Sequence, residues 1–143
     1  MYAGDAPSFG EIDDTNGNLR LSYWVDYWLQ HMFPAPPGAT LLQYYATDDA
    51  ELETLAVKHP DNSVVVMIAY HALNATTDNT GPGAPRSVLV DISQPPAAFQ
   101  TASLLTIDAK TNLTTGPIES TVSLAQQIPL TFNGYGVTFL TLK

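Results

Sequence analysis

Residues 63–70 read Ser-Val-Val-Val-Met-Ile-Ala-Tyr, and this run decides the fold more than any other part of the sequence. Successive side chains of a β-strand point to opposite faces of a sheet, so a strand with one wet face alternates apolar and polar residues. This run is instead apolar at every position from Val64 to Ala69. We therefore predict a central strand at residues 63–71, covered by a facing sheet on one side and by another element on the other.

The second cover is predicted to be a helix at residues 19–33, before the strands. Asn16 or Asn18 is placed to cap its N-terminus, and His31 to complement its C-terminal carbonyls. Apolar side chains recur at the spacing of one helical face, namely Leu21, Trp24, Val25, Trp28, Leu29 and Met32. We expect this aromatic helix to pack on the sheet.

The rest of the chain carries short apolar and β-branched runs separated by Asp, Asn, Gly and Pro, which is typical of strands joined by turns. No helical pattern lies between them, which favours antiparallel over parallel pairing. The predicted fold class is mainly β, an antiparallel β-sandwich of about seven to eight strands preceded by one N-terminal amphipathic helix. The further strands are placed at residues 41–47, 52–58, 87–92, 102–107, 128–132 and 137–142.

The domain organisation follows from the same pattern. Residues 1–38 are predicted to form a turn-rich lead-in and the aromatic helix, packing on a sandwich made by residues 39–143. Together they make one domain, which suits a chain of 143 residues.

Composition argues against several classes of partner. Fourteen acidic and five basic residues give a net charge of −9, which opposes binding to nucleic acid or to an anionic membrane surface. The chain has no cysteine, so it holds no disulfide and no Cys-ligated zinc. Its first residues lack the basic and apolar regions of a secretory signal, and any such signal is expected upstream.

Candidates for catalysis are few. Glycosidases use two carboxylates about 5–10 Å apart, and Glu51 with Glu53 is the only such pair that shares a predicted strand face. Both lie beside a turn, so a solvated edge is the favoured interpretation. The histidines His31, His59 and His71 lack the sequence context of a Ser-His-Asp site. We predict no catalytic residue.

A metal site is not predicted either. Asp13, Asp14, Asn16 and Asn18 resemble the start of an oxygen-rich calcium loop, but the Gly and the distant Glu of such a loop are missing. No phosphate-binding loop occurs, and we predict no metal and no cofactor.

Aromatic rings are the remaining candidates, because sugars stack on exposed rings. Tyr135, in a Gly-flanked turn, is the first candidate for carbohydrate binding. Tyr44 and Tyr45 point to opposite sides of one predicted strand, so only one of them faces outward. Trp24 is the fourth candidate, although its place on the apolar helix face favours burial.

Residues 10–24 (GEIDDTNGNLRLSYW) resemble the stretch that closes the barrel in clan A glycoside hydrolases, where a turn with Asp and Gly precedes a helix with a Tyr-Trp pair. The strands that follow resemble the C-terminal β-sandwich of those enzymes, as in family 39 xylosidases and iduronidases and arabinofuranosidase-like relatives. The later similarity runs through residues 44–48 (YYATD), 55–62 (LAVKHPDN), 88–92 (VLVDI) and 133–140 (NGYGVTFL).

The resemblance implies a division of labour. In such enzymes both catalytic glutamates lie on barrel strands, before everything that this chain matches. The Asn-Glu dipeptide of their acid/base site does not occur in this sequence, so no catalytic residue is carried over. What carries over is an architectural role beside a barrel, together with a secreted or extracellular setting in polysaccharide degradation.

These observations predict a non-catalytic accessory β-sandwich, associated with a glycoside hydrolase and supporting its catalytic barrel. The alternative is a carbohydrate-binding module that recognises plant-type polysaccharide through exposed rings. A complete small enzyme is the third and least favoured hypothesis. The predicted partners are a glycosidase barrel or carbohydrate, and an exposed aromatic helix would also support a homodimer.

Overall fold

The computed structural model describes residues 11–13, 15–33, 38–43, 50–71, 83–92 and 99–143. One helix, α1 (Leu21–Met32), precedes all the strands. The eight strands are β1 (Thr40–Leu41), β2 (Leu52–Lys58), β3 (Val64–Tyr70), β4 (Arg86–Asp91), β5 (Ala102–Ile107), β6 (Ser120–Val122), β7 (Gln127–Phe132) and β8 (Gly136–Leu142).

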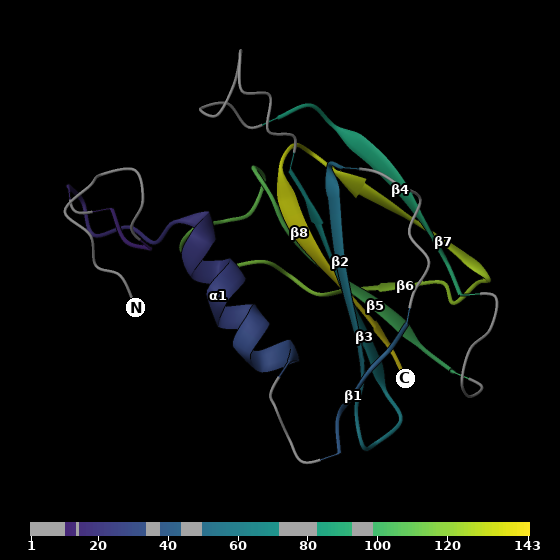
Figure 1. Cartoon of the computed structure of the whole chain (residues 1–143). Coiled ribbons are helices and arrows are strands. Elements are labelled where there is room, and N and C mark those ends of the chain that lie inside the picture. Colours follow the sequence, from purple (N-terminus) through teal and green to yellow (C-terminus); the bar gives the residue numbers. More distant parts are fainter. Residues whose placement is uncertain (1–10, 14, 34–37, 44–49, 72–82, 93–98) are drawn as a thin grey trace.

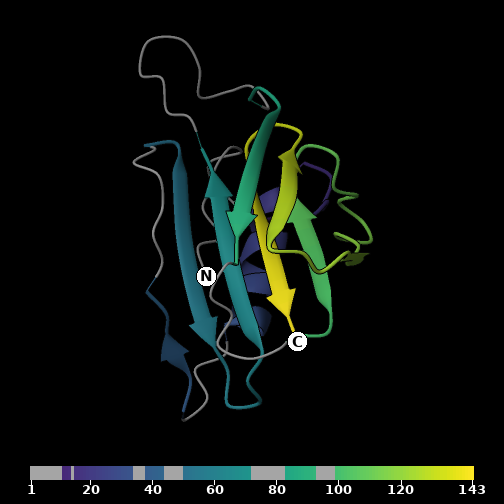
Figure 2. The same cartoon turned by 90° about the vertical axis from the view of Figure 1, so that its right-hand side faces the viewer.

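The strands form two antiparallel sheets. Six of them make one sheet in the order β1-β2-β3-β8-β5-β6, and β4 pairs with β7 in a two-stranded ribbon. Figure 1 shows three layers, with α1 on one side of the large sheet and the ribbon on the other. In Figure 2 the ribbon lies in front of the large sheet and α1 behind it. The predicted fold class, a mainly β antiparallel sandwich preceded by one helix, is confirmed.

Strand β3 lies inside the large sheet and is covered on both faces, as the uninterrupted apolar run predicted. Its neighbours are β2 and β8. Val64, Ile68 and Tyr70 belong to the core beneath the ribbon, whereas Val65 belongs to the core beneath α1. Because side chains alternate along a strand, one apolar run fills two separate cores.

The ribbon supplies its own half of the first core. Along β7 exposed and buried residues alternate, and Ile128, Leu130 and Phe132 point inward. Val88 and Val90 of β4 pack beside them and are partly buried. The period-two pattern of these two strands therefore marked the correct inward faces.

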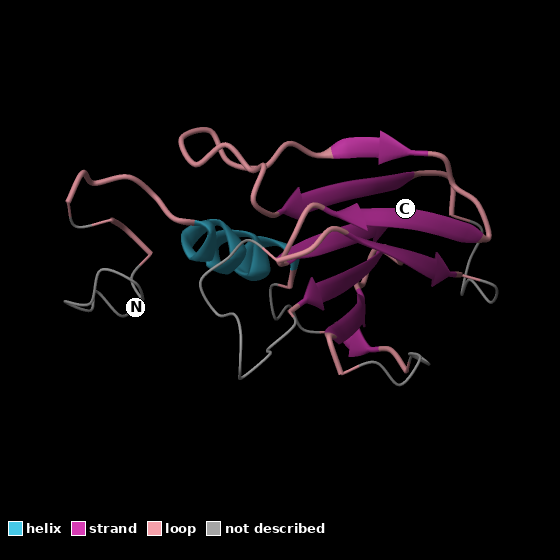
Figure 3. Cartoon of the chain, turned by 90° about the horizontal axis from the view of Figure 1, so that it is seen from above, coloured by secondary structure: helices cyan, strands magenta, loops and turns pink. Residues whose placement is uncertain are grey.

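The helix packs on the opposite face of the large sheet, and Figure 3 shows it lying alongside that sheet. Seven apolar side chains on and just after α1 contact the second core, namely Leu21, Trp24, Val25, Trp28, Leu29, Met32 and Phe33. None of the helical residues is fully buried. The sheet residues beneath them are buried, with Phe139 at 0% and Leu105 at 1% exposure.

The predicted helix cap is wrong. The N-cap residue is Arg20, and no side chain caps the helix there. The Asn16 side chain instead accepts a hydrogen bond from the Asn18 backbone N–H at 2.9 Å. Gly17, with φ of 72°, closes this tight turn, and Ile12 forms a β-bridge with Leu19 behind it. The asparagines thus serve a turn that ends before the helix begins.

Two strand predictions also need correction. The strand expected at residues 41–47 is represented by β1, only two residues long, while residues 44–49 lie outside the described part. Strand β6 was missed, because its sequence Ser-Thr-Val is short and mostly exposed. It forms by pairing with β5, as in the register of Ala102 with Val122, which no local pattern signals.

Candidate functional site

The outer side of α1 carries a ladder of rings. The ring centroids of Tyr23 and Tyr27 are 6.2 Å apart and stacked, and those of Tyr27 and His31 are 4.0 Å apart and stacked. These residues are four positions apart, so they lie one above another on a helix. Tyr27 keeps 38% of its surface exposed. Together with Trp24 and Trp28 they form what we call the aromatic flank.

His31 occupies the last turn of the helix, as the sequence predicted. Its Nδ1 lies 2.6 Å from the carbonyl oxygen of Tyr27, one turn earlier. This carbonyl lies four positions before His31, so the contact is a local one that holds the ring against the last turn of the helix. The contact also holds the imidazole flat against the Tyr27 ring.

The two tryptophans lie where the flank meets the rest of the molecule. Trp24 Nε1 donates a hydrogen bond to the Leu113 carbonyl oxygen at 3.1 Å. Its ring lies so close to Gly116 that a Cβ there would come within 2.6 Å of it. Trp28 Nε1 is buried and has no hydrogen-bond partner among the described residues. Trp24 therefore packs against the 112–116 turn, and its predicted role in carbohydrate binding stays a prediction.

The C-terminal end of α1 is tied to the β2–β3 turn. His59 Nε2 lies 3.1 Å from the carbonyl oxygen of Met32, the last helical residue. The turn itself is closed by the Asp61 carboxylate, which accepts from the Ser63 hydroxyl and backbone N–H. These bonds lower the pKa of Asp61. The sequence placed His59 in a turn but gave no sign that it contacts the helix.

Tyr135 lies at the opposite side of the large sheet, in the core beneath the ribbon. Its ring centroid is 5.4 Å from that of Tyr70. A Cβ at Gly83 would come within 2.7 Å of the ring. Tyr135 is therefore half-buried between these neighbours rather than held out as an exposed platform. Its carbohydrate-binding role remains a prediction, and Tyr44 and Tyr45 lie outside the described residues.

The two glutamates considered as a catalytic pair contact different partners. Glu51 lies in the turn before β2 and pairs with Arg86, the first residue of the ribbon. Arg86 also lies over the Tyr70 ring, at 5.3 Å. Glu53 is inside β2, pairs in register with Ala69, and lies 3.9 Å from His71 Nε2. The shared strand face expected for the two glutamates is wrong, because β2 begins after Glu51.

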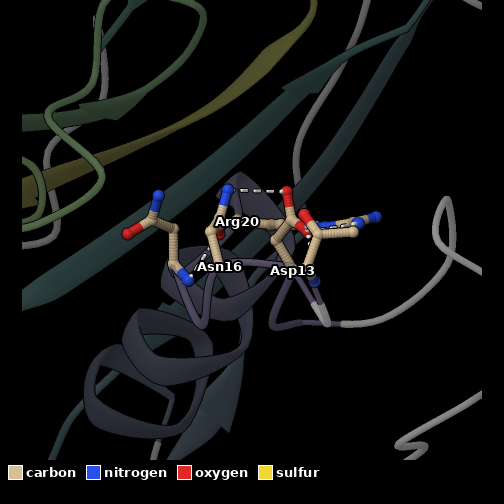
Figure 4. A network of polar contacts seen from close by, with 5 residues as sticks. Asp13, Asn16 and Arg20 are labelled. Atoms are coloured by element: carbon tan, nitrogen blue, oxygen red, sulfur yellow. Dashed lines mark hydrogen bonds and ion pairs between the residues drawn. The ribbon is translucent and has the colours of Figure 1, made fainter.

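The Asp13 carboxylate accepts hydrogen bonds from residues of its own turn, as Figure 4 shows. It accepts hydrogen bonds from the Thr15 backbone and hydroxyl and from the Asn16 amide, and Arg20 lies 4.0 Å away. These contacts lower the pKa of Asp13, and the hydrogen bond from the Thr15 hydroxyl has the largest effect. No group of three acids or histidines able to hold a metal occurs among the described residues. Asp14 is not among them.

Asp108 is the carboxylate buried most deeply in the described part, with 3% of its surface exposed. It accepts from the Asn133 amide at 2.9 Å, the Asn133 backbone at 3.0 Å and the Lys110 backbone at 2.8 Å. Burial alone raises its pKa, but these hydrogen bonds outweigh burial and lower the pKa below the usual value. Asp108 thereby fastens the end of β5 to the β7–β8 turn, which is a structural role that sequence reasoning missed.

The fold of this chain is similar to portions of several glycoside hydrolases of known structure. The chain superposes on a family 30 subfamily 8 xylanase from Clostridium acetobutylicum with a TM-score of 0.65 and 12% identity, over 94% of this chain and 30% of that one. A family 30 endoxylanase from Clostridium papyrosolvens gives 0.62 and 12%, over 92% and 30%. The catalytic domain of xylanase C from Talaromyces cellulolyticus gives 0.51 and 12%, over 76% and 21%.

These likenesses show the fold alone. The chain spans about a third or less of the length of the xylanases it matches. No protein-family model matches the sequence, and no curated protein matches it. The expected relation to glycoside hydrolases is thus supported at the level of fold, through family 30, while the likeness to family 39 stays a prediction. Within the described residues no helix is long and apolar enough to cross a membrane.

Proposed function

We propose that this protein is a non-catalytic accessory β-sandwich that supports the catalytic barrel of a glycoside hydrolase. The observation that carries the proposal is the superposition of nearly the whole chain on less than a third of two family 30 xylanases. A fold that recurs as a fixed portion of larger enzymes suits a supporting part. The secreted or extracellular setting implied by the sequence belongs to the same proposal.

The polar groups of the described residues support a structural role. Asp13, Asp61 and Asp108 are each tied by local hydrogen bonds whose effect is to lower their pKa. A general acid for glycoside hydrolysis needs the reverse, a carboxyl group whose pKa is raised. Glu51 and Glu53 have separate partners, Arg86 at the start of β4 and His71 just after β3.

The helix side is the proposed contact with the barrel. Among the described residues, four buried ones form the core beneath α1, and all four belong to the large sheet. The aromatic flank leaves apolar surface exposed, which is typical of an interface. If a further layer packed against the aromatic flank, the side chains of α1 would become buried. The inward side chains of β7, on the opposite face of the sheet, are already buried.

The proposal is tested in two assays on the isolated chain. Reducing-sugar release from xylan and arabinan should stay at the level of buffer. Adding the chain to a family 30 xylanase from which the portion matched by this chain has been removed should raise the Tm of that remaining barrel. Tyr27→Ala should weaken this effect, whereas Leu89→Ala, a change on the ribbon, should not. Hydrolysis by the chain alone, or no effect on the barrel, would contradict the proposal.

Carbohydrate binding is the competing outcome. The structure leaves Tyr27 as an exposed ring and packs Tyr135 and Trp24 against neighbours. Retention of the chain on insoluble xylan or cellulose, abolished by Tyr135→Ala, would replace the supporting role with that of a binding module. Without retention, the supporting role stands as the better account.

A further inference from the structure

We infer that the aromatic flank of α1 binds a second copy of this chain when the protein is isolated, forming a two-fold dimer through helix-to-helix contact. The inference concerns the surface that the proposed function assigns to a barrel, but it depends only on the properties of that surface. It begins from the incomplete burial of α1. Every side chain of the helix that faces the core is only partly buried, although Phe139 and Leu105 below are at 0% and 1% exposure.

The composition of the flank favours apolar association. It consists of Tyr23, Trp24, Tyr27, Trp28 and His31, and Leu113, which is 39% exposed, lies against Trp24. Tyrosine and tryptophan contribute most of the binding energy at protein interfaces, because they bury large area with few rotatable bonds. The stacked contacts between Tyr23, Tyr27 and His31 hold these rings in place before any partner arrives, which lowers the entropic cost of binding.

Charge decides where two copies can meet. The chain carries a net charge of −9, so most approaches between two molecules are repulsive. The aromatic flank contains no carboxylate, and Asp26 is the only acid on α1. This helix therefore offers an approach with little like-charge repulsion. A two-fold arrangement brings the same flank from both copies together, as closed dimers require.

Trp28 adds a second, independent sign. Its Nε1–H is buried without an acceptor, and such a donor costs about 1–3 kcal/mol when left unpaired. Trp28 lies 5.4 Å from the Tyr27 ring, centroid to centroid. No neighbour in the described structure provides an acceptor for this N–H, so an unsatisfied donor lies next to the exposed Tyr27 ring of the flank.

The interface is small, because α1 has twelve residues and is about 18 Å long. Stable complexes bury roughly 800 Å² on each partner. We therefore expect reversible dimers with a dissociation constant on the order of tens to hundreds of micromolar. Because the molecules repel elsewhere, dimerisation should strengthen by several-fold as salt rises from about 0.05 to about 0.5 M. A dimer held by opposite charges would weaken instead.

Sedimentation equilibrium over a concentration series tests the inference directly. The unaltered chain should pass from monomer to dimer, and Tyr27→Ala should reduce the association constant about tenfold or more. Leu89→Ala is the matched control, because Leu89 is 55% exposed on the outer face of the ribbon. Unchanged far-UV circular dichroism would show that both variants fold. A monomer at about 1 mM in both salts, or a dimer lost only in Leu89→Ala, would overturn the inference.

Cross-linking places the contact. The chain has no cysteine, so Tyr27→Cys and Leu89→Cys each give a single reactive thiol. A short bismaleimide should link Tyr27→Cys molecules into covalent dimers and leave Leu89→Cys molecules monomeric. Linkage of both to the same extent would contradict a specific flank-to-flank dimer.

The outcome is separable from that of the proposed function. A strictly monomeric chain that still raises the Tm of a barrel would overturn the dimer and leave the supporting role intact. A flank-dependent dimer that does not raise the Tm of a barrel would support the dimer and overturn the supporting role. If both hold, added barrel should compete with dimer formation, since the two partners then share Tyr27.

Discussion

The two faces of the large sheet are covered to different degrees, and this contrast explains the molecule better than either face alone. In the part of the chain that the structure describes, nine buried residues form the core on the ribbon side, and the ribbon itself contributes three of them, Ile128, Leu130 and Phe132. The core on the helix side has four, all from the sheet. The ribbon covers its face of the sheet completely enough to bury three of its own side chains. The helix has no fully buried side chain, so part of its apolar surface remains available to a partner.

The largest loss of stability is expected from a substitution on the ribbon side of the sheet. Phe132→Ala removes a ring that is 0% exposed and lies tilted against the Tyr70 ring, with centroids 5.7 Å apart. Loss of buried contacts plus the remaining cavity should lower the free energy of unfolding by about 3–5 kcal/mol. Urea denaturation followed by circular dichroism measures it, and Leu89→Ala on the same ribbon should change it by less than about 0.5 kcal/mol. An equal loss of unfolding free energy in Phe132→Ala and Leu89→Ala would mean that the inward side chains of the ribbon do not form part of the core.

The next effect tests the helix side. Gly116 has φ of 80°, and a Cβ there would meet the Trp24 ring at 2.6 Å. Gly116→Ala therefore combines backbone strain with displacement of the indole and should cost about 2–4 kcal/mol. Gly17→Ala is the matched control, because Gly17 has φ of 72° but no atom within 4 Å of its added Cβ.

Tryptophan fluorescence gives this test a local readout. The chain's two tryptophans, Trp24 and Trp28, both lie on α1. Gly116→Ala should shift their emission, whereas Gly17→Ala should only lower stability, by about 1–2 kcal/mol. A fluorescence shift of the same size in both variants would show that the turn does not position Trp24.

A third effect concerns the tie between the large sheet and the ribbon. Asp108→Asn replaces an acceptor with an amide that must face donors from Asn133 and Lys110. Loss of hydrogen bonds to a charged group should cost about 1.5–3 kcal/mol at pH 7. Asp26→Asn, at an exposed position on α1, should have almost no effect.

The pH dependence gives the sign of the same contribution. The pKa of Asp108 is lower in the folded protein than its usual value of 3.8. Its stabilising contribution is therefore fully present above the unfolded-state pKa and is lost as pH falls through 3.8 toward the folded-state pKa. The stability gap between the unaltered chain and Asp108→Asn should narrow as the pH of the urea titration is lowered from 7 to about 3. A gap that stays constant would contradict the assigned role.

The smallest effect is expected at the helix C-terminus. His59→Ala removes the contact to the Met32 carbonyl, and the loss of one hydrogen bond to a helix end should cost about 1 kcal/mol. Amide exchange should quicken in α1 but not in β7. His71→Ala is the control, since His71 is a partly exposed histidine whose side chain lies beside Glu53 of β2. Faster amide exchange in both α1 and β7 would mean that the helix and the ribbon are not destabilised independently of each other.

Much of this fold was readable from local pattern. The bounds predicted for β2 and β5, residues 52–58 and 102–107, agree with those observed, because each strand is a continuous run between turn residues. The helix was predicted within two residues at either end. Its cap was not, because Asn16 and Asn18 are equally suited to a tight turn.

The candidate site was less predictable. Tyr135 lies between two glycines in sequence, which suggested an exposed ring, yet Gly83 and Tyr70 enclose it from distant parts of the chain. Tyr27 was not singled out, although among the tyrosines and tryptophans of α1 it is the one that the structure leaves exposed. Its exposure depends on how the helix is rotated on the sheet, and periodicity only approximates that rotation.

The sequence by itself determined the layers: a central strand apolar on both faces, a helix with one apolar side, and strands with one inward face. These features follow from side-chain periodicity, which is local. Only the tertiary structure decided that β8 lies between β3 and β5, that His59 contacts the end of α1, and that the helix side stays incompletely buried. Those outcomes depend on contacts between residues far apart in the chain, whose free energy no short stretch of sequence records.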